Sequence, residues 1–382
     1  MREFFVAPEI HSFSTFGDFA KEFTVGKGDL ILTNECIYDL YMKKLNLDCK
    51  YVFQEKYGDG EPTDVMVDEI LTVANEADYK RIIAVGGGTI LDISKFLRVA
   101  NCENIDQMYD KMVNSVAQLD SAREYIAVPT TCGTGSEVTN IAVANRTRMG
   151  TKLGLVSPTL FADYAVLIPE FLDQLPYYVF ASSSIDALIH AVESYLSPNA
   201  SSYSELFSLE AITDILKGYC KIAANGQDAR KEDSEMYQRA SNYAGIAFSN
   251  GGCALVHALS FSLGGKYHVP HGEANYEFFT DILDFYQKKN PDGKIKGLGE
   301  LIYSILKKNG YKKAETETNG IVLLDALLND ILPKKRMSEY GATEADVEVW
   351  AEATIANQQR LLKNNYVSVT IDEIKDLYRS RL

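Results

Sequence analysis

A chain of 382 residues, 46% of them hydrophobic, is long enough to form two domains with sizeable cores. Its net charge of −15 argues against a nucleic-acid partner, because an acidic surface repels phosphate backbones. No apolar run reaches the roughly 18 residues that a membrane-spanning helix needs, so we expect no membrane partner.

The six cysteines are scattered along the chain, and no two of them form a C-x-x-C pair. This distribution favours reduced thiols over a disulfide framework. The apolar stretch near the N-terminus is too short for a secretory signal peptide. We therefore expect a cytoplasmic protein.

Short apolar runs alternate with helical patterns in the first half of the chain. Buried strands are expected at residues 29–33, 51–53, 81–85 and 125–128. Thr63 has the sequence pattern of a helix N-cap, and a further helix is expected at 89–100. Strand–helix–strand repetition at this spacing predicts an α/β domain whose parallel, Rossmann-like sheet has helices on both faces.

The second half of the chain is almost wholly helical in pattern. Helices are expected at residues 183–196, 203–223, 234–247, 254–263, 275–288, 298–308, 321–332, 344–363 and 371–381. We therefore place a domain boundary near residue 180. Residues 1–180 are expected to form the α/β dinucleotide-binding domain, and 181–382 an all-α, metal-binding catalytic domain.

Asp186 and His190 are four residues apart in an expected helix, so their side chains share one face. A carboxylate and an imidazole placed in this way can bind one metal ion. His257 and His271 downstream would complete a set of three nitrogens and one oxygen, which suits Fe(II) or Zn(II). The alternative is a surface or capping pair, a common use of the same spacing.

Two loops that follow expected strands are suited to binding anions. The first, Gly86-Gly87-Gly88, leads into a helix, and the N–H groups at a helix N-terminus attract phosphates. The second loop, residues 129–139, is rich in hydroxyls and glycines. Neither is the usual G-x-G-x-x-G fingerprint, and each could be a simple structural turn. Because both follow strands of one parallel sheet, we favour a nucleotide site at its carboxyl edge.

Taken together, these segments resemble the iron-containing (group III) alcohol dehydrogenase family. The similarity is carried, in order, by residues 86–95, 129–139, 186–193 and 255–275. The resemblance implies NAD, with NADP as the alternative, on the first domain. It also implies iron, or in some members zinc, bound by Asp186, His190, His257 and His271.

The resemblance also defines the expected cofactor contacts. They are Asn34, Gly86, Gly87, Gly88, Thr89, Asp92, Thr130, Thr131, Thr134, Ser136 and Lys152.

His257 and His271 are fourteen residues apart, which is about 21 Å along a continuous helix. They could bind one ion only if that helix stopped between them. Gly264, Gly265 and Pro270 provide such a stop, so we expect His271 to begin a new helix. The alternative for His257 is a buried histidine in an apolar helix.

The chain departs from the family pattern at two positions. Asn34 stands where an acidic residue would select NAD over NADP, although Glu35 could replace it. Phe261 stands where many members have a histidine near the nicotinamide, which leaves a histidine proton relay in doubt. His268 is either a replacement relay or a turn residue, and we favour the turn. Glu193 is expected to support the metal ligands, with a solvent-facing helix position as the alternative.

The expected reaction is a metal-assisted hydride transfer between a primary alcohol and the nicotinamide. Within the family, residues 275–293 and the acidic C-terminal helices most resemble enzymes that interconvert 4-hydroxybutyrate and succinate semialdehyde. A hydroxy acid needs a cation for its carboxylate, and Lys152, Arg146 and Lys266 are candidates. Family members commonly associate, so a homo-oligomer is expected.

Three alternatives stay open. The first is a dehydrogenase for another small alcohol or diol. The second is a metal- and NAD-dependent lyase of the dehydroquinate synthase type. That chemistry needs many lysines and arginines around a phosphorylated substrate, and the helices near the expected metal have few. The third is a metal-binding protein without catalytic activity.

Overall fold

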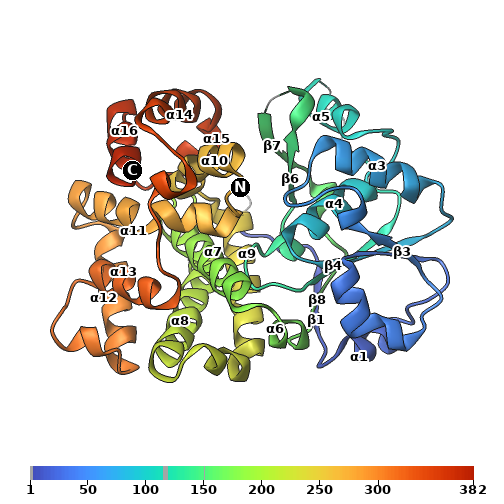
Figure 1. Cartoon of the computed structure of the whole chain (residues 1–382), viewed down its shortest axis with the longest axis horizontal. Coiled ribbons are helices and arrows are strands. Elements are labelled where there is room, and N and C mark those ends of the chain that lie inside the picture. Colours follow the sequence, from blue (N-terminus) through green and yellow to red (C-terminus); the bar gives the residue numbers. More distant parts are fainter. Residues whose placement is uncertain (1–2, 115–118, 150) are drawn as a thin grey trace. The chain divides into compact units, whose positions relative to one another are not determined.

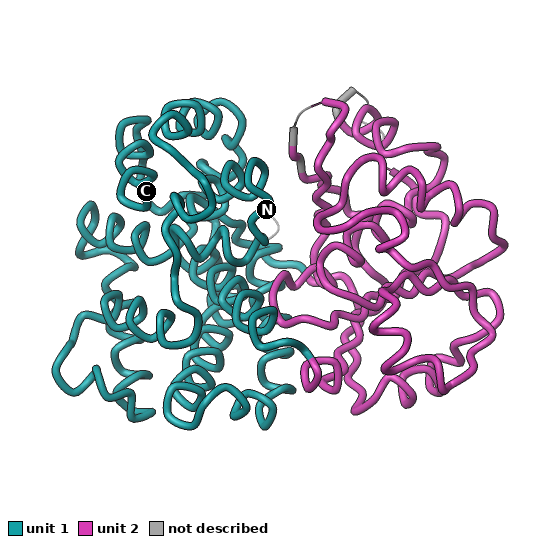
Figure 2. Tube along the Cα trace, in the orientation of Figure 1, with its two compact units in different colours: residues 1–5, 175–382 teal, residues 6–174 magenta. Residues whose placement is uncertain are grey.

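A computed structural model describes residues 3–114, 119–149 and 151–382 of the chain (Figure 1). The chain forms two compact units (Figure 2). Val6–Gln174 make up one, which we call the sheet unit, and Met1–Phe5 with Leu175–Leu382 make up the other, the helical unit. The change from one to the other after Gln174 lies a few residues before the boundary expected near residue 180.

The sheet unit contains a six-stranded sheet in the order β1-β8-β5-β4-β2-β3, in which every pairing is parallel. Its strands are β1 (Glu9–Ser12), β2 (Asp29–Thr33), β3 (Lys50–Phe53), β4 (Arg81–Gly86), β5 (Glu124–Pro129) and β8 (Tyr164–Leu167). The parallel sheet predicted from the sequence is confirmed. The edge strand β1 and strand β8 are additional to the expected ones, as is the antiparallel pair of β6 (Ile141–Arg146) and β7 (Thr151–Val156).

Helices lie on both faces of this sheet. They are α1 (Phe16–Glu22), α2 (Glu35–Ile37), α3 (Asp64–Asn75), α4 (Gly88–Arg98), α5 (Ile105–Asn114) and α6 (Glu170–Asp173). Alternate residues of β4 enter two separate cores, because successive strand side chains point to opposite faces. Ile82 and Ala84 pack with α3, α4 and α5, whereas Ile83 and Val85 pack with α1.

The helical unit is built around a buried helix, α7, which packs against α8, α9 and α11. Its longer helices are α7 (Tyr177–Leu196), α8 (Ser202–Asn225), α9 (Ser234–Gly251), α10 (Leu255–Tyr267), α11 (His271–Lys289), α12 (Lys294–Lys308), α13 (Gly320–Ile331), α14 (Glu344–Asn357) and α16 (Ile371–Ser380). The expectation of one helix over residues 344–363 is wrong. The chain leaves helical geometry at Gln358, and a short helix, α15 (Gln359–Leu362), follows.

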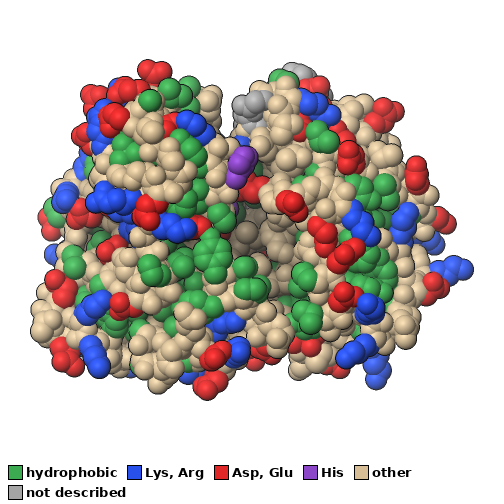
Figure 3. Space-filling view, in the orientation of Figure 1, with side chains coloured by type: hydrophobic (Ala, Val, Ile, Leu, Met, Phe, Trp, Pro, Cys, Tyr) green, Lys and Arg blue, Asp and Glu red, His purple; other side chains and the backbone are tan. Residues whose placement is uncertain are grey.

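No single helix in the described part of the chain is long and apolar enough to cross a membrane. Gln227–Gly251 and Leu255–Tyr267 pass that test only as a pair, bent by 106°. Acidic and basic side chains are interspersed over both units on the face shown in Figure 3.

Candidate metal centre and cofactor loops

Helix α7 carries Asp186 and His190 in its buried middle section. Both side chains are almost fully enclosed. One helical turn separates them, and the Asp186 carboxylate lies 3.9 Å from Nδ1 of His190. Burial alone would raise the pKa of Asp186, but the surrounding histidines and the Asn275 amide outweigh it and lower that pKa. The site therefore favours an anionic carboxylate among imidazoles, as a cation site requires.

His257 and His271 come from two helices that meet at a sharp turn. Helix α10 ends at Tyr267, His268 adopts a left-handed conformation with φ of 53°, and α11 begins at His271 directly after Pro270. The predicted break between the two histidines is confirmed, but the expectation that Gly264 and Gly265 stop the helix is wrong, because α10 continues through both. The break brings the two histidine rings to a centroid distance of 5.4 Å. His268 itself is exposed in the turn.

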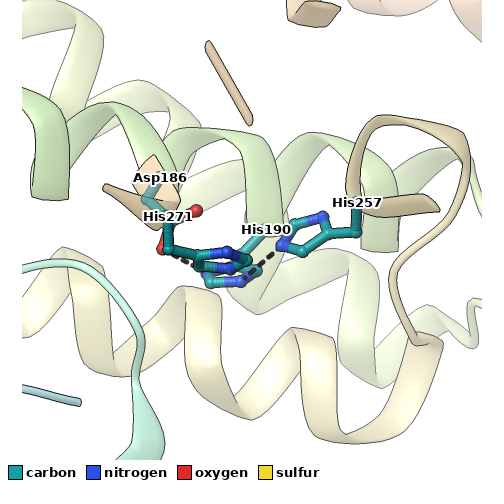
Figure 4. A group of neighbouring side chains, drawn as sticks. All are labelled: Asp186, His190, His257 and His271. Atoms are coloured by element: carbon teal, nitrogen blue, oxygen red, sulfur yellow. Dashed lines mark hydrogen bonds and ion pairs between the residues drawn. The ribbon is translucent and has the colours of Figure 1, made fainter. Parts of the chain in front are cut away.

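The four side chains point toward one another (Figure 4). Each offers one ligand atom, and these atoms all lie within 4.8 Å of one another. Nε2 of His257 lies 3.0 Å from Nε2 of His190. Gly272 permits this approach, because a Cβ there would lie 2.3 Å from the carbonyl oxygen of Ser182 in α7. The structure thus brings together all four residues expected at the metal.

Glu193 supports this group from one turn beyond His190. Its carboxylate accepts hydrogen bonds from the backbone N–H groups of Ala254, at 3.0 Å, and Val256, at 2.7 Å. It also lies 2.7 Å from Nδ1 of His257. A proton on Nδ1 leaves the lone pair of Nε2 facing the other ligands, as metal-bound histidines require. Glu193 is buried, so a solvent-facing position is excluded.

Asn275 is a member of this group that sequence reasoning did not single out. Its Nδ2 lies 2.7 Å from Oδ1 of Asp186, 3.1 Å from Nε2 of His257 and 3.2 Å from Nε2 of His271. The hydroxyl of Ser260 donates to its Oδ1 and fixes the amide. The signal in the sequence was its spacing, four residues after His271 on the same helix face.

The donor set fits a divalent cation. Three of its four members direct a ligand atom at one electropositive N–H₂ group, so they are already arranged around a common donor. Three imidazole nitrogens and a carboxylate oxygen within the reach of one ion suit Fe(II) or Zn(II).

In the sheet unit, the two anion-binding loops predicted from the sequence lie side by side. They follow the adjacent strands β4 and β5, where Gly86 is in register with Pro129. The close packing requires glycine, because a Cβ on Gly88 would lie 2.8 Å from the Thr134 side chain. The N-cap residue of α4 is Gly87, which has no side chain to accept a hydrogen bond from the first N–H groups of the helix. Such a terminus suits a phosphate.

Asp92 and Ser136 hold the two loops together. The Ser136 hydroxyl donates to Oδ1 of Asp92 at 2.6 Å, and Oδ2 of Asp92 accepts from the N–H of Val143. Lys95, which is fully buried, donates to Ser136 Oγ at 2.6 Å and to Thr139 Oγ1 at 3.0 Å. Burial lowers the pKa of Lys95. These side chains brace the loops from within.

The remaining cofactor candidates are distributed around the same unit. Thr89 donates to the carbonyl of Gly60, and Lys152 pairs with Glu61 at 2.6 Å. Thr130 is buried, and its N–H donates to the carbonyl of Gly86. Thr131 lies beside Gly87.

Asn34 follows β2 and donates to Glu55, which follows β3, at 3.1 Å. The other oxygen of Glu55 accepts from the N–H of Glu35 at 2.5 Å. Sequence reasoning missed Glu55, because its proximity to Asn34 depends on the pairing of β2 with β3.

Comparison with known proteins agrees with the fold. Residues 9–169 match the family model "Iron-containing alcohol dehydrogenase", and residues 180–382 match "Fe-containing alcohol dehydrogenase family, C-terminal".

The chain belongs to the iron-containing alcohol dehydrogenase family.

Relatives within this family match over most of the chain. The 4-hydroxybutyrate dehydrogenase of Clostridium kluyveri is 47% identical over 374 residues, covering 98% of each chain. The probable alcohol dehydrogenase EutG of Escherichia coli is 30% identical, over 84% of this chain and 77% of its own. The protein described here is therefore an oxidoreductase that interconverts alcohols and aldehydes, as predicted.

Solved structures share the fold. A 1,3-propanediol oxidoreductase superposes with a TM-score of 0.82 at 23% identity, covering 100% of both chains. The iron-containing alcohol dehydrogenase of Thermococcus thioreducens does so with a TM-score of 0.80 at 24% identity, covering 99% of both. At this identity the similarity establishes architecture alone. The family match, rather than the fold, argues against a lyase and against an inert metal-binding protein.

Phe261 occupies the position where the sequence resemblance led us to expect a histidine in many family members. Its ring lies near His271, with centroids 6.1 Å apart. A phenyl ring can neither donate nor accept the proton that a histidine would transfer. An apolar ring therefore lies beside the candidate ligand His271.

Proposed function

We propose that this protein is an NAD-dependent 4-hydroxybutyrate dehydrogenase whose metal is bound by Asp186, His190, His257 and His271. The observation that carries the proposal is the convergence of four ligand atoms within 4.8 Å. The substrate is supported by the 4-hydroxybutyrate dehydrogenase that is 47% identical over 98% of both chains.

The metal follows from the family and from the donor set. Iron is the family's characteristic metal, and zinc suits the same ligands. When bound, such a cation acts as a Lewis acid that stabilises an alkoxide relative to the alcohol. Asp186 contributes the negative charge, which its low pKa maintains. Glu193 holds the proton on Nδ1 of His257, so Nε2 remains a ligand.

The nicotinamide cofactor is proposed to lie along the carboxyl edge of the parallel sheet. Its phosphates would meet the glycine loop and the N-terminus of α4, where backbone N–H groups attract anions. The family resemblance supplies the contacts proposed for this cofactor. They are Asn34, Gly86, Gly87, Gly88, Thr89, Asp92, Thr130, Thr131, Thr134, Ser136 and Lys152. Of these, Asp92 and Ser136 act by bracing the loops.

NAD is favoured over NADP by Glu55. Asn34 stands where a carboxylate would bind the ribose 2′-hydroxyl, and Glu55 supplies a carboxylate to that same position. A 2′-phosphate would be repelled by this charge. Glu35, the substitute expected from sequence, contributes its backbone N–H to Glu55 instead.

The cellular location and the oligomeric state are also part of the proposal. All six cysteines are free, which supports a reducing, cytoplasmic setting. Association into a homo-oligomer is the second, and light scattering of the purified protein would measure it.

The test is an assay of the purified protein loaded separately with Fe(II) and Zn(II). With NAD and 4-hydroxybutyrate, NADH should form, and chelation should abolish its formation. Elemental analysis should find about one equivalent of metal, and a His257→Ala variant should lose it. Formation of NADH by fully chelated protein, or an unchanged metal content in the variant, would contradict the proposal.

A further inference from the structure

A hydroxy acid substrate leaves one requirement unmet by the residues named so far. Its carboxylate needs a cation, and the three candidates taken from the sequence already have acidic partners. Lys152 pairs with Glu61, Arg146 with Asp106 and Lys266 with Asp346. An ion-paired cation offers little to a second anion, because its charge is already compensated.

Arg360 has no such partner. Within the described residues no hydrogen bond or ion pair engages its guanidinium, and no carboxylate acts on its pKa. Partial burial lowers the pKa of the Arg360 guanidinium, although part of the side chain is exposed. Cys253 is the one group that raises this pKa. By contrast, Arg379 and Arg381 near the C-terminus each pair with glutamate. An arginine remains charged at any physiological pH, so Arg360 is an uncompensated cation.

The segment that carries Arg360 is anchored beside the candidate metal centre. Helix α15 packs against α10, the helix of His257. Just beyond α15, the amide of Asn364 donates to the carbonyl of Cys253 at 3.0 Å and accepts from Asn199 at 2.8 Å. The thiol of Cys253 lies within 4.8 Å of ligand atoms of both Glu193 and His257.

Cys253 is buried beside Glu193 and His257. The segment that carries Arg360 is thus fixed next to the side of the metal centre where Glu193 supports His257. The break after Asn357, which sequence patterning did not predict, starts the short helix that carries Arg360.

We propose that Arg360 binds the carboxylate of the substrate and so makes the enzyme selective for ω-hydroxy acids over neutral alcohols. The inference rests on the proposed function and adds a determinant of specificity to it. A guanidinium presents two parallel N–H groups to a carboxylate, which gives both charge and direction. Three methylene carbons separate the carboxylate of 4-hydroxybutyrate from its hydroxyl oxygen, so the two ends of the substrate can be bound by different groups.

The experiment compares an acid with a neutral alcohol of equal length. kcat and KM are measured for 4-hydroxybutyrate and for 1-butanol in wild-type holoenzyme and in Arg360→Met. Loss of the charged pair should raise KM for the acid by about 30-fold or more. KM for 1-butanol should stay within about twofold or fall, because it has no carboxylate. Lys363→Met, which removes an exposed cation from the same segment, should change neither.

A binding measurement separates this role from a structural one. Butyrate should inhibit 1-butanol oxidation by the wild type, and Arg360→Met should weaken that inhibition by a similar factor. Arg360→Lys keeps the charge but loses the paired N–H groups, and should fall between the two. It also serves as the test if Arg360→Met does not fold.

The two possible failures are distinguishable. A wild type that oxidises 1-butanol but no hydroxy acid would refute the proposed substrate. A wild type that oxidises 4-hydroxybutyrate, with Arg360→Met and Arg360→Lys unchanged in KM and in butyrate inhibition, would refute the role of Arg360 alone. An equal loss of activity of Arg360→Met with 4-hydroxybutyrate and with 1-butanol would also refute the role of Arg360.

Discussion

Glu193 and His257 are joined by a buried contact of 2.7 Å between a carboxylate oxygen and Nδ1. The same carboxylate accepts two backbone N–H groups at the start of α10, so it fixes both the helix and the histidine that the helix carries. A carboxylate behind a histidine increases the basicity of the ligand nitrogen and holds the ring in place. We therefore expect the contact between Glu193 and His257 to increase the affinity of this protein for its metal.

Glu193→Gln should weaken metal binding by about 10- to 100-fold. The amide nitrogen of glutamine is a donor, so it cannot replace a carboxylate oxygen opposite the backbone N–H groups. Competition with a chromogenic chelator would measure the affinity, with Glu235→Gln on exposed α9 surface as the control. Equal affinities in the two variants would contradict a supporting role.

Asn275→Ala should destabilise the metal-free protein more than the metal-loaded one, and by linkage the metal affinity of the folded protein should not fall. Without metal, its N–H₂ group is the donor that three ligand side chains share. Removing it leaves buried acceptors without that partner, which costs about 1–3 kcal/mol. Urea unfolding with and without metal measures the difference. A larger loss of stability in the loaded form would be the contrary result.

The sequence was informative where a site depends on local geometry. Asp186 and His190 share a helix face whatever surrounds the helix, and Pro270 foretold the start of a new helix at His271. The glycines at the C-terminal end of β4 likewise marked a loop that needs close packing. In each case a few consecutive residues contain the whole signal.

It was less informative where side chains meet across the fold. Asn275 and Glu55 act through partners on other elements, and the burial of Lys95 follows from a loop more than forty residues downstream. β1 was missed because it is largely exposed and lacks an apolar run. The break at Gln358 interrupts a pattern that favours one long helix, so tertiary contacts decide it.

Glu55→Gln should shift cofactor preference toward NADP by about tenfold, the equivalent of about 1.4 kcal/mol. The substitution removes the carboxylate that we expect near the 2′ position and keeps one acceptor oxygen, which can serve either Asn34 or the N–H of Glu35. The ratio of kcat/KM for NAD to that for NADP gives the result. Glu35→Gln, whose side chain is exposed, is the matched control. A larger shift in that control would assign the selectivity to Glu35.

Gly272→Ala should disrupt the docking of α11 against α7. The added methyl group would lie 2.3 Å from the carbonyl oxygen of Ser182, and backbone cannot move aside as a flexible side chain can. Overpacking of this kind costs about 1–3 kcal/mol. The displacement would also move His271, so metal affinity should fall together with the melting temperature. Gly265→Ala, where nothing lies within 4 Å, should leave both unchanged or raise stability.

Glu277 predicts a pH dependence of stability near neutrality. Burial raises the pKa of Glu277 from 4.5 to about 7, against the opposing effect of Arg381, whose Nη2 lies 2.7 Å away. Between these values the folded protein retains a proton that the unfolded chain has released. The contribution of Glu277 is therefore complete below pH 4.5 and is lost as pH rises toward 7.

The measurement is urea unfolding of metal-free protein at pH 5 and pH 7.5. The wild type should lose about 1–3 kcal/mol more over this interval than Glu277→Gln, which cannot ionise. The comparison uses the change with pH within each protein, so the cost of leaving Arg381 without a carboxylate cancels. An equal change in both proteins would mean that Glu277 ionises at the same pH in the folded and unfolded states. A steeper change in the variant would reverse the sign and assign the burial effect to another group.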